Sequence, residues 1–230
     1  MKPLADCRLY TFVDTAYLRG RAPEVVAQQL CDGGSDLIQL RAKKSPPDEI
    51  RRVAEAILLI TRRVNVGLVI NDHPDIARDL DVEFCHLGQE DFFDAGYKHV
   101  SKLKKGRDGP PSRPSGALGA RALPGLRIGL STHSPDQAQR ALAAGPDYIA
   151  VGPVYATGTK PTAKPVTLEY VRWAAANVSI PWFAIGGINL QTLDDVLAAG
   201  AKRICVVSAI LNAPDVAKAC ADFRRRLEYV

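Results

Sequence analysis

Short runs of apolar residues recur along this chain, and most are followed by a stretch with helical spacing or by turn residues. The runs are continuous rather than alternating, which is typical of strands buried on both faces. The pattern therefore predicts parallel strands inside a layer of helices. The eight predicted strands cover residues 8–14, 36–43, 67–72, 83–89, 127–133, 148–154, 182–187 and 203–210.

Apolar residues at helical spacing separate several of these strands. Ser134 precedes one such stretch and is predicted to cap its N-terminus. Three stretches end in glycine shortly before the next strand, in CDGGSD, LAAGPD and LAAGAK, as expected where a left-handed residue closes the last helical turn. The predicted helices cover residues 23–30, 48–60, 135–144, 191–199 and 214–227.

Eight successive strand–helix units predict an α/β fold, specifically a TIM (β/α)8 barrel. The chain has 230 residues, enough for one such barrel, so we expect a single domain over residues 1–230. A doubly wound open sheet is the alternative, but no GxGxxG follows the first predicted strand.

Residues 106–125 interrupt the regular pattern. This segment is dense in Gly, Pro, Ser and Arg and has no hydrophobic period. Such a composition predicts a flexible surface insertion between the fourth and fifth units. A basic arm that contacts a partner is the alternative interpretation.

The chain carries a net charge of +5 and has a pI near 9.0. Basic and acidic residues alternate over most of its length, without the aromatic and basic interleaving typical of single-strand binders, so we expect no nucleic-acid partner. A small anionic substrate accounts for a mildly basic protein equally well. There is no apolar run of about 18 residues, so no membrane span is predicted.

The five cysteines are scattered and form no CxxC pair. An odd number at wide spacing favours free thiols over disulfides or a zinc site. The N-terminal residues lack the apolar segment of a signal peptide. Together these features predict a cytoplasmic protein.

In (β/α)8 barrels the chemistry lies at the carboxyl ends of the strands. The second predicted strand ends in QLRAK, where Gln39, Arg41 and Lys43 alternate and are expected to point the same way. Three donors on one face suit a polyanion, and the guanidinium fork suits phosphate oxygens. A salt-bridged strand end is the alternative.

The third predicted strand ends in IND, and the fourth leads into HLGQED. Asn71 and Asp72 are therefore expected near Asp91 at the mouth of the barrel. Two carboxylates beside phosphate-seeking donors suit Mg²⁺, which prefers oxygen ligands and retains waters and substrate phosphates. Helix capping by each aspartate is the alternative.

The last strand ends supply a second group of anion-seeking residues. Glycine and small hydroxyl residues in these places commonly form a monophosphate cradle from backbone N–H groups. Lys160 is expected to join the first group, whereas His86 and Cys205 are expected to serve packing and internal hydrogen bonding. The second group comprises Thr157, Thr159, Gly187 and Ser208.

Two anion-binding groups in one mouth predict a transferase that brings two phosphorylated substrates together, with pyrophosphate as the leaving group. In this order and at barrel spacing, the segments QLRAK, IND, HLGQED, GLSTH, VGPVYATGTK, AIGGI and VVSAI resemble the thiamine-phosphate synthase family. The resemblance covers nearly the whole chain apart from the insertion. It implies a Mg²⁺-dependent transferase of thiamine biosynthesis and a homo-oligomer.

Members of that family join hydroxymethylpyrimidine diphosphate to hydroxyethylthiazole phosphate. The resemblance implies that Asp72 and Asp91 bind Mg²⁺, and that Arg41, Lys43, Ser131 and Lys160 are catalytic. It implies that the pyrimidine diphosphate is bound by Gln39, Leu40, Arg41, Ala42, Lys43, Asn71, Ser131 and Lys160. It implies that the thiazole phosphate is bound by Thr157, Gly158, Thr159, Gly187, Val207 and Ser208.

Two features depart from the family pattern. Ala42 stands where an acidic or polar residue is usual, and the segment between QED and STH is longer than usual. The nearest alternative is a thiazole tautomerase, which would need neither the aspartate pair nor Arg41 and Lys43. A sugar-phosphate epimerase and a non-enzymatic ligand sensor are more distant alternatives.

Overall fold

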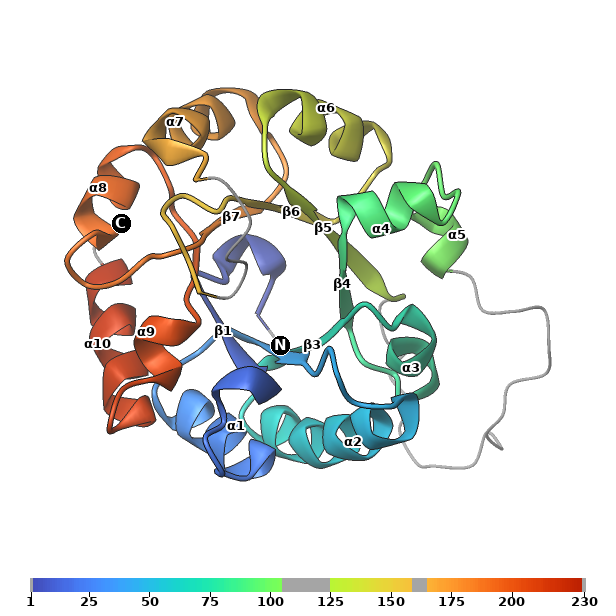
Figure 1. Cartoon of the computed structure of the whole chain (residues 1–230), viewed down its shortest axis with the longest axis vertical. Helices are drawn as coiled ribbons and strands as arrows, with labels where there is room; N and C mark the ends of the chain where they lie inside the picture. Colours follow the sequence, from blue (N-terminus) through green and yellow to red (C-terminus); the bar gives the residue numbers. More distant parts are fainter. Residues whose placement is uncertain (1, 105–124, 159–164, 229–230) are drawn as a thin grey trace.

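Eight parallel strands form a closed barrel in this chain (Figure 1). The structure is a computed structural model that describes residues 2–104, 125–158 and 165–228. Each strand pairs with the next, and the last pairs with the first through Leu9–Ile204 and Tyr10–Cys205. The TIM barrel prediction is thus confirmed and the open sheet is wrong. The strands are β1 Leu9–Asp14, β2 Leu37–Arg41, β3 Gly67–Asn71, β4 Phe84–Gly88, β5 Arg127–Thr132, β6 Tyr148–Val151, β7 Trp182–Ile185 and β8 Ile204–Cys205.

Helices surround the barrel on its outside (Figure 1). The stretches with a clear apolar period became α1, α2, α6, α8 and α10, as predicted. Helices of one or two turns, such as α3 and α4, are too short to show a period in the sequence. The α-helices are α1 Pro23–Asp32, α2 Pro47–Arg63, α3 Pro74–Asp79, α4 Gln89–Asp94, α5 Ser101–Lys104, α6 Pro135–Ala143, α7 Thr167–Asn177, α8 Leu193–Ala198, α9 Ser208–Leu211 and α10 Val216–Leu227, and the 3-10 helices are η1 Leu4–Asp6 and η2 Thr15–Tyr17.

The predicted helix ends have the expected local geometry. Ser134 Oγ accepts a hydrogen bond from the backbone N–H of Gln137 at 3.2 Å, which caps α6. Gly34, Gly145 and Gly200 have φ angles of +83°, +71° and +100°, the left-handed region that glycine enters without steric cost. Turn chemistry in the sequence therefore predicted where these helices stop.

All eight strands are shorter than the runs predicted for them, and the differences at β8 and β6 have physical reasons. The run over 203–210 ends as a strand at Cys205, and Ser208–Leu211 forms α9 instead. Ile210 and Leu211 are still buried, but they reach the core from a helix rather than from a strand. The run over 148–154 ends at Val151, because Pro153 has no N–H to give to a sheet.

Aromatic rings fill the interior of the barrel. The Phe183 ring lies edge-on to the rings of Tyr10 and Tyr148, with centroid distances of 5.4 and 5.7 Å. The rings of Phe84 and Tyr148 pack in the same manner at 6.3 Å. All four side chains are buried, so the barrel interior is a packed core.

Apart from Gly125, the predicted insertion over 106–125 lies outside the described residues. No helix among the described residues is long and apolar enough to cross a membrane. All five cysteines are free, as expected, and burial raises the pKa of the Cys7 and Cys220 thiols to about 12.

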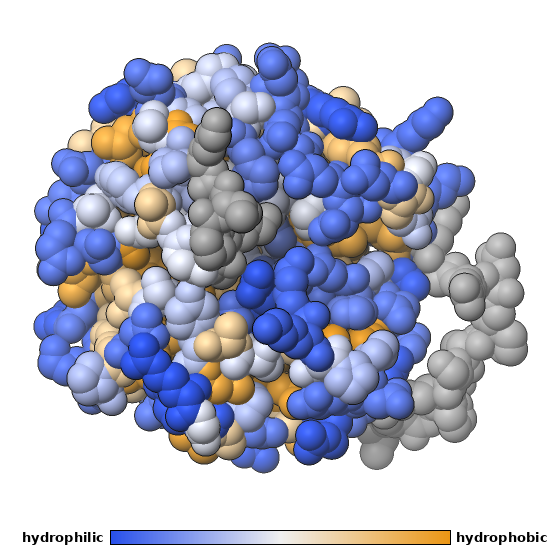
Figure 2. All heavy atoms as spheres, in the orientation of Figure 1, coloured by the Kyte–Doolittle hydropathy of each residue, from blue (hydrophilic) through white to orange (hydrophobic). Residues whose placement is uncertain are grey.

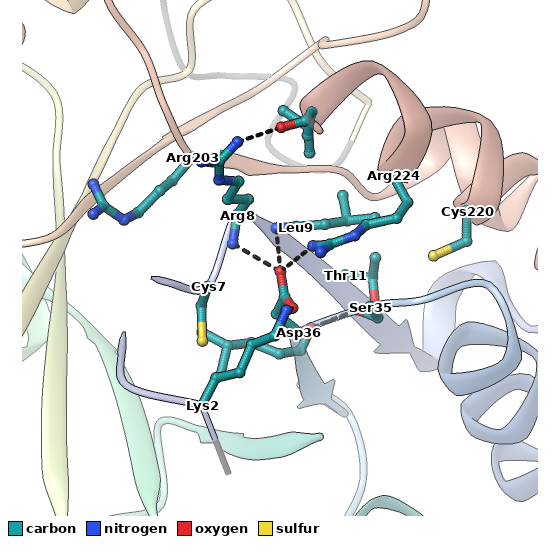
Figure 3. A network of polar contacts seen from close by, with 12 residues as sticks. Lys2, Cys7, Arg8, Leu9, Thr11, Ser35, Asp36, Arg203, Cys220 and Arg224 are labelled. Carbon is teal, nitrogen blue, oxygen red and sulfur yellow. Dashed lines mark hydrogen bonds and ion pairs between the residues drawn. The ribbon is translucent and has the colours of Figure 1, made fainter. Parts of the chain in front are cut away.

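One buried carboxylate, that of Asp36, joins the starts of β1 and β2 at the amino-terminal end of the barrel (Figure 3). Asp36 accepts hydrogen bonds from the backbone N–H groups of Arg8 and Leu9, at 2.8 and 3.1 Å. It also pairs with Arg224 at 2.9 Å and with Lys2 at 2.6 Å. Its side chain is only 4% exposed. Asp36 therefore ties β1 to the start of β2 and to α10.

We predict that Asp36→Asn lowers the free energy of unfolding by roughly 2–3 kcal/mol, because it removes a buried charge that two backbone N–H groups and two cations contact. The matched control is Asp79→Asn, which breaks the more exposed ion pair with Arg51 and should cost at most about 1 kcal/mol. Urea unfolding of both variants measures the difference. Equal midpoints would show that the Asp36 contacts add nothing to stability.

Candidate active site

A cavity opens at the carboxyl ends of the barrel strands, and every strand contributes to its wall. Figure 2 shows hydrophilic residues gathered around the middle of the face that is seen in Figure 1. The lining combines apolar residues deep in the barrel with polar residues at the strand ends. From the strands themselves it includes Tyr10, Phe12, Gln39, Arg41, Asn71, His86, Gly88, Ser131, Thr132, Ala150, Ile185 and Cys205.

The end of β2 presents its polar residues to this cavity, as the alternation predicted. Gln39, Arg41 and Lys43 all line it. Arg41 Nη1 also forms an ion pair with Asp14 Oδ2 at 2.8 Å, and the Asp14 side chain is 1% exposed. Arg41 therefore forms a salt bridge, which was the alternative interpretation of this strand end, and it also faces the cavity. A buried carboxylate that holds a guanidinium in place pre-orients it for an anion.

The ends of β3 and β4 bring the two predicted aspartates to the same cavity. Asp72 and Asp91 both line it, together with Asn71. Asp72 Oδ2 accepts a hydrogen bond from Asn71 Nδ2 at 2.6 Å and pairs with Lys43 Nζ at 3.1 Å. A Cβ atom on Gly88 would lie 2.6 Å from Asp91 Oδ2, so the glycine leaves room for this carboxylate.

The donor set suits a cation that takes only part of its ligands from protein. Among the described residues, no cluster of three or more His, Cys, Asp or Glu side chains could hold a metal ion. Asp72 and Asp91 together offer carboxylate oxygens only. Mg²⁺ commonly binds one or two carboxylates and completes its shell with water and phosphate oxygens. The two aspartates therefore fit Mg²⁺ better than they fit zinc.

On the opposite side, the ends of β7 and β8 contribute Gly187, Val207 and Ser208 to the cavity, and Thr157 joins them from the loop after β6. Gly186 and Gly187 have φ angles of +105° and +65°. A Cβ atom on Gly187 would lie 2.6 Å from both the Ala156 oxygen and Tyr155 Cβ. The second glycine is thus required by the close approach of the β6 loop.

The structure brings most of the predicted residues together, with some exceptions. Leu40 is buried and does not line the cavity, since it alternates with Gln39 and Arg41 along β2. Ala42 lines a neighbouring cavity beside Asp72 and Asp91. Gly158 is outside the cavity lining. The placement of Thr159 and Lys160 lies outside the described residues, so their roles stay predictions.

Sequence reasoning missed several residues of the site. Asp14 ends β1 at the same rim as Arg41, and the strand end RLYTFVD was the available signal. Tyr10 and Phe12 look like ordinary core residues in the sequence, yet they line the cavity. His86 is hydrogen-bonded inside the barrel, as predicted, and it also faces the cavity.

The closed barrel and the polar cavity at the carboxyl ends of its strands define the class of (β/α)8-barrel enzymes, which keep their active sites in this place. A family model described as thiamine monophosphate synthase matches residues 9–104 and 114–210. The chain therefore belongs to the thiamine monophosphate synthase family.

Relatives and solved structures agree with this membership. A thiamine-phosphate synthase of Thermus thermophilus is 43% identical over 196 residues, which is 85% of this chain and 84% of the relative. One of Acidothermus cellulolyticus is 41% identical over 97% of this chain and 96% of its own. The structure of thiamine phosphate pyrophosphorylase from Pyrococcus furiosus has a TM-score of 0.79 at 28% identity and covers 98% of both chains. The resemblance inferred from the motifs, and with it a transferase, is confirmed.

A more distant structure, 3-hexulose-6-phosphate synthase, has a TM-score of 0.62 at 17% identity over 95% of this chain and 98% of that one. At this identity the likeness shows the barrel fold alone.

Gly187 and Gly158 are both predicted to bind the thiazole phosphate, but they differ in whether the structure leaves room for a side chain. We predict that Gly187→Ala lowers the free energy of unfolding by about 1–3 kcal/mol, because it combines a left-handed backbone with a steric clash. Gly158→Ala is the matched control, since a Cβ there would meet only the Tyr17 hydroxyl, at 3.4 Å, and should change stability by less than about 0.5 kcal/mol. Thermal or urea unfolding compares them. Equal stability would show that the loop after β6 is free to move aside.

Proposed function

We propose that this chain joins 4-amino-2-methyl-5-(diphosphooxymethyl)pyrimidine to 4-methyl-5-(2-phosphooxyethyl)thiazole, giving thiamine phosphate and pyrophosphate. One observation carries the proposal: a single cavity has cationic and carboxylate groups on its β2–β4 side and glycine and hydroxyl groups on its β6–β8 side. We call these the diphosphate side and the monophosphate side. Membership in the family supports the same reaction.

On the diphosphate side, the cations are held in place before substrate arrives. Arg41 is anchored by the buried Asp14, and Lys43 by Asp72. Donors that are already oriented need little reorganisation when negative charge develops, and this is commonly the largest catalytic effect. Lys160 is proposed to join them from the loop after β6. Gln39, Asn71 and Ser131 would complete the contacts to the pyrimidine diphosphate.

Asp72 and Asp91 would hold Mg²⁺ on this side. When bound, the ion neutralises charge on the phosphate groups and so stabilises pyrophosphate as a leaving group. Lys43 competes for Asp72 in the structure, since the same carboxylate oxygen pairs with its ammonium group. Lys43 would therefore turn from Asp72 toward the diphosphate when substrate is present.

The reaction needs neither a nucleophilic side chain nor a general base from the protein. The C–O bond to the diphosphate breaks with its electron pair going to oxygen, and the resulting pyrimidine-methyl cation is stabilised by its ring amino group. The lone pair of the thiazole nitrogen then forms the C–N bond, and no proton leaves that nitrogen. Burial raises the pKa of the Cys205 thiol well above its usual range, so this thiol stays protonated in the cavity wall.

On the monophosphate side, we propose that Thr157, Gly187, Val207 and Ser208 hold the thiazole phosphate, together with Gly158 and Thr159. Ser208 begins α9, and Val206 and Val207 connect it to the end of β8. Backbone N–H groups at such a helix start are suited to a phosphate. This arrangement would place the thiazole ring across the cavity from Arg41 and Lys43.

The assay that tests the proposal mixes both phosphorylated precursors with the protein and Mg²⁺ and measures thiamine phosphate. We expect product, its loss when a chelator removes the metal, and its return when Mg²⁺ is restored. Folded protein that makes no thiamine phosphate would disprove the proposal. Conversion of a thiazole phosphate that continues in chelator would favour the thiazole tautomerase instead.

A second prediction compares two adjacent lysines. Lys43→Ala should lower kcat by about 10²–10³, because it removes a positioned donor to the departing pyrophosphate. Its matched control is Lys44→Ala, since Lys44 is exposed and does not line the cavity. Steady-state kinetics with each substrate varied separates kcat from KM. Equal effects of the two substitutions would assign Lys43 to the surface rather than to the site.

A cytoplasmic location, a homo-oligomeric state and the absence of a nucleic-acid partner belong to the proposal as expectations from the sequence. Size-exclusion chromatography with light scattering would measure the oligomeric state directly.

A further inference from the structure

A continuous chain of hydrogen bonds runs through the barrel interior and connects the two polar residues at its ends. Gln39 Nε2 donates to the Tyr10 hydroxyl at 2.5 Å. The Tyr10 and Tyr148 hydroxyls lie 3.3 Å apart, and Tyr148 lies 3.2 Å from His86 Nδ1. His86 Nε2 lies 2.9 Å from Ser131 Oγ. The chain thus starts at β2 and ends at β5, and both ends line the cavity.

The middle of this chain is shielded from water. Tyr10 is 1% exposed, Tyr148 is fully buried and His86 is 7% exposed. The Phe183 ring packs edge-on against both tyrosine rings. Burial raises the pKa of both phenols well above the usual range, so each hydroxyl keeps its single proton. Each therefore donates one hydrogen bond and accepts others.

The direction of the first bond determines the rest. An amide nitrogen cannot accept, so the Tyr10 oxygen is the acceptor from Gln39 and its own proton must go elsewhere. Tyr148 is the acceptor within reach. If Tyr148 donated to Tyr10 instead, the Tyr10 proton would be buried without a partner, which costs free energy. Tyr148 therefore donates to His86 Nδ1.

We propose that Tyr10, Tyr148 and His86 form a proton-orienting relay that fixes the hydrogen-bonding character of both ends of the cavity at once. His86 Nδ1 accepts from Tyr148, so the imidazole proton lies on Nε2 and is donated to Ser131 Oγ. Ser131 is left with its own proton to donate into the cavity, while the Gln39 carbonyl oxygen is left as an acceptor. Reversing the relay would exchange the two roles.

The polarity of this relay matches the proposed reaction, and this step rests on that proposed function. A departing pyrophosphate gains negative charge and needs donors, which Ser131 supplies in this arrangement. An aminopyrimidine carries N–H groups and needs an acceptor, which Gln39 supplies. His86, Tyr148 and Tyr10 are then positioning residues, since they act through Ser131 and Gln39 and not on the reacting atoms.

The first experiment reads the state of His86 without any substrate. The chain has four histidines, so ¹⁵N-histidine labelling gives few imidazole signals, and His86→Gln assigns the missing one. We expect Nε2 of His86 to carry the proton and Nδ1 to be the unprotonated nitrogen that accepts from Tyr148. A proton on Nδ1, or on both nitrogens, would overturn the relay.

The second experiment breaks the relay by one atom. Tyr148→Phe removes the donor to Nδ1, so the proton of His86 should spread over both nitrogens. We expect kcat to fall about three- to ten-fold, the worth of one positioned hydrogen bond, with KM for each substrate within about two-fold. A lower kcat with the His86 signals unchanged would mean loss of packing only and would overturn the proposal.

The matched control is Tyr170→Phe. The Tyr170 hydroxyl is also buried and donates to Thr132 Oγ1 at 2.7 Å, outside the relay. We expect the His86 signals to be unchanged and kcat to stay within about two-fold of the parent chain. A shift of the His86 signals in this variant as large as in Tyr148→Phe would overturn the relay.

The two proposals can fail separately. If the parent chain makes no thiamine phosphate but His86 shows the expected tautomer and responds to Tyr148→Phe, the relay stands and the proposed function fails. If thiamine phosphate is made and His86 carries its proton on Nδ1, the function stands and the relay fails.

Discussion

Closure of the barrel is the constraint on which the rest of this structure depends. The backbone of β8 pairs with β1 at only two positions, Leu9–Ile204 and Tyr10–Cys205, yet this contact turns an open sheet into a ring. In a ring of parallel strands all the carboxyl ends face the same mouth. Residues as distant in sequence as Arg41 and Ser208 thereby line one cavity.

The two ends of the barrel use charge in different ways. At the amino ends, Asp36 is surrounded by donors and is fully engaged in holding β1, β2 and α10 together. At the carboxyl ends, Asp14 orients Arg41, and Asp72 pairs with Lys43. Arg41, Lys43 and Asp72 line the cavity, whereas Asp14 does not. The buried carboxylate of Asp36 thus stabilises the fold at the amino ends, whereas that of Asp14 pre-orients a cation at the carboxyl ends.

The barrel interior is part of the site as well as part of the core. Aromatic packing around Tyr10 and Tyr148 excludes water, which gives their hydroxyls fixed partners. A hydrogen-bonded chain in such surroundings is costly to leave incomplete, so each member orients the next. The same side chains that fill the barrel can therefore set the donor and acceptor groups that a substrate meets.

Much of the fold could be predicted from the sequence, because buried parallel strands and capped helices leave local signals. Continuous apolar runs marked the eight strands, and glycines such as Gly34 and Gly145 marked helix ends. Local signals failed where an apolar run changes conformation without changing composition. Ile210 is buried whether it lies in a strand or in α9, so the run over 203–210 looked like one strand.

The sequence by itself determined the barrel, the family and the strand ends that carry charge, since alternation along a strand decides which side chains share a face. Alternation also placed Gln39, Arg41 and Lys43 on one face, whereas the family resemblance had included Leu40, which does not line the cavity. Only the tertiary structure decided that Asp14 holds Arg41, and that His86 lies between Tyr148 and Ser131. Those partners come from different strands, and their contacts depend on the register and curvature of the closed sheet, which no local pattern encodes.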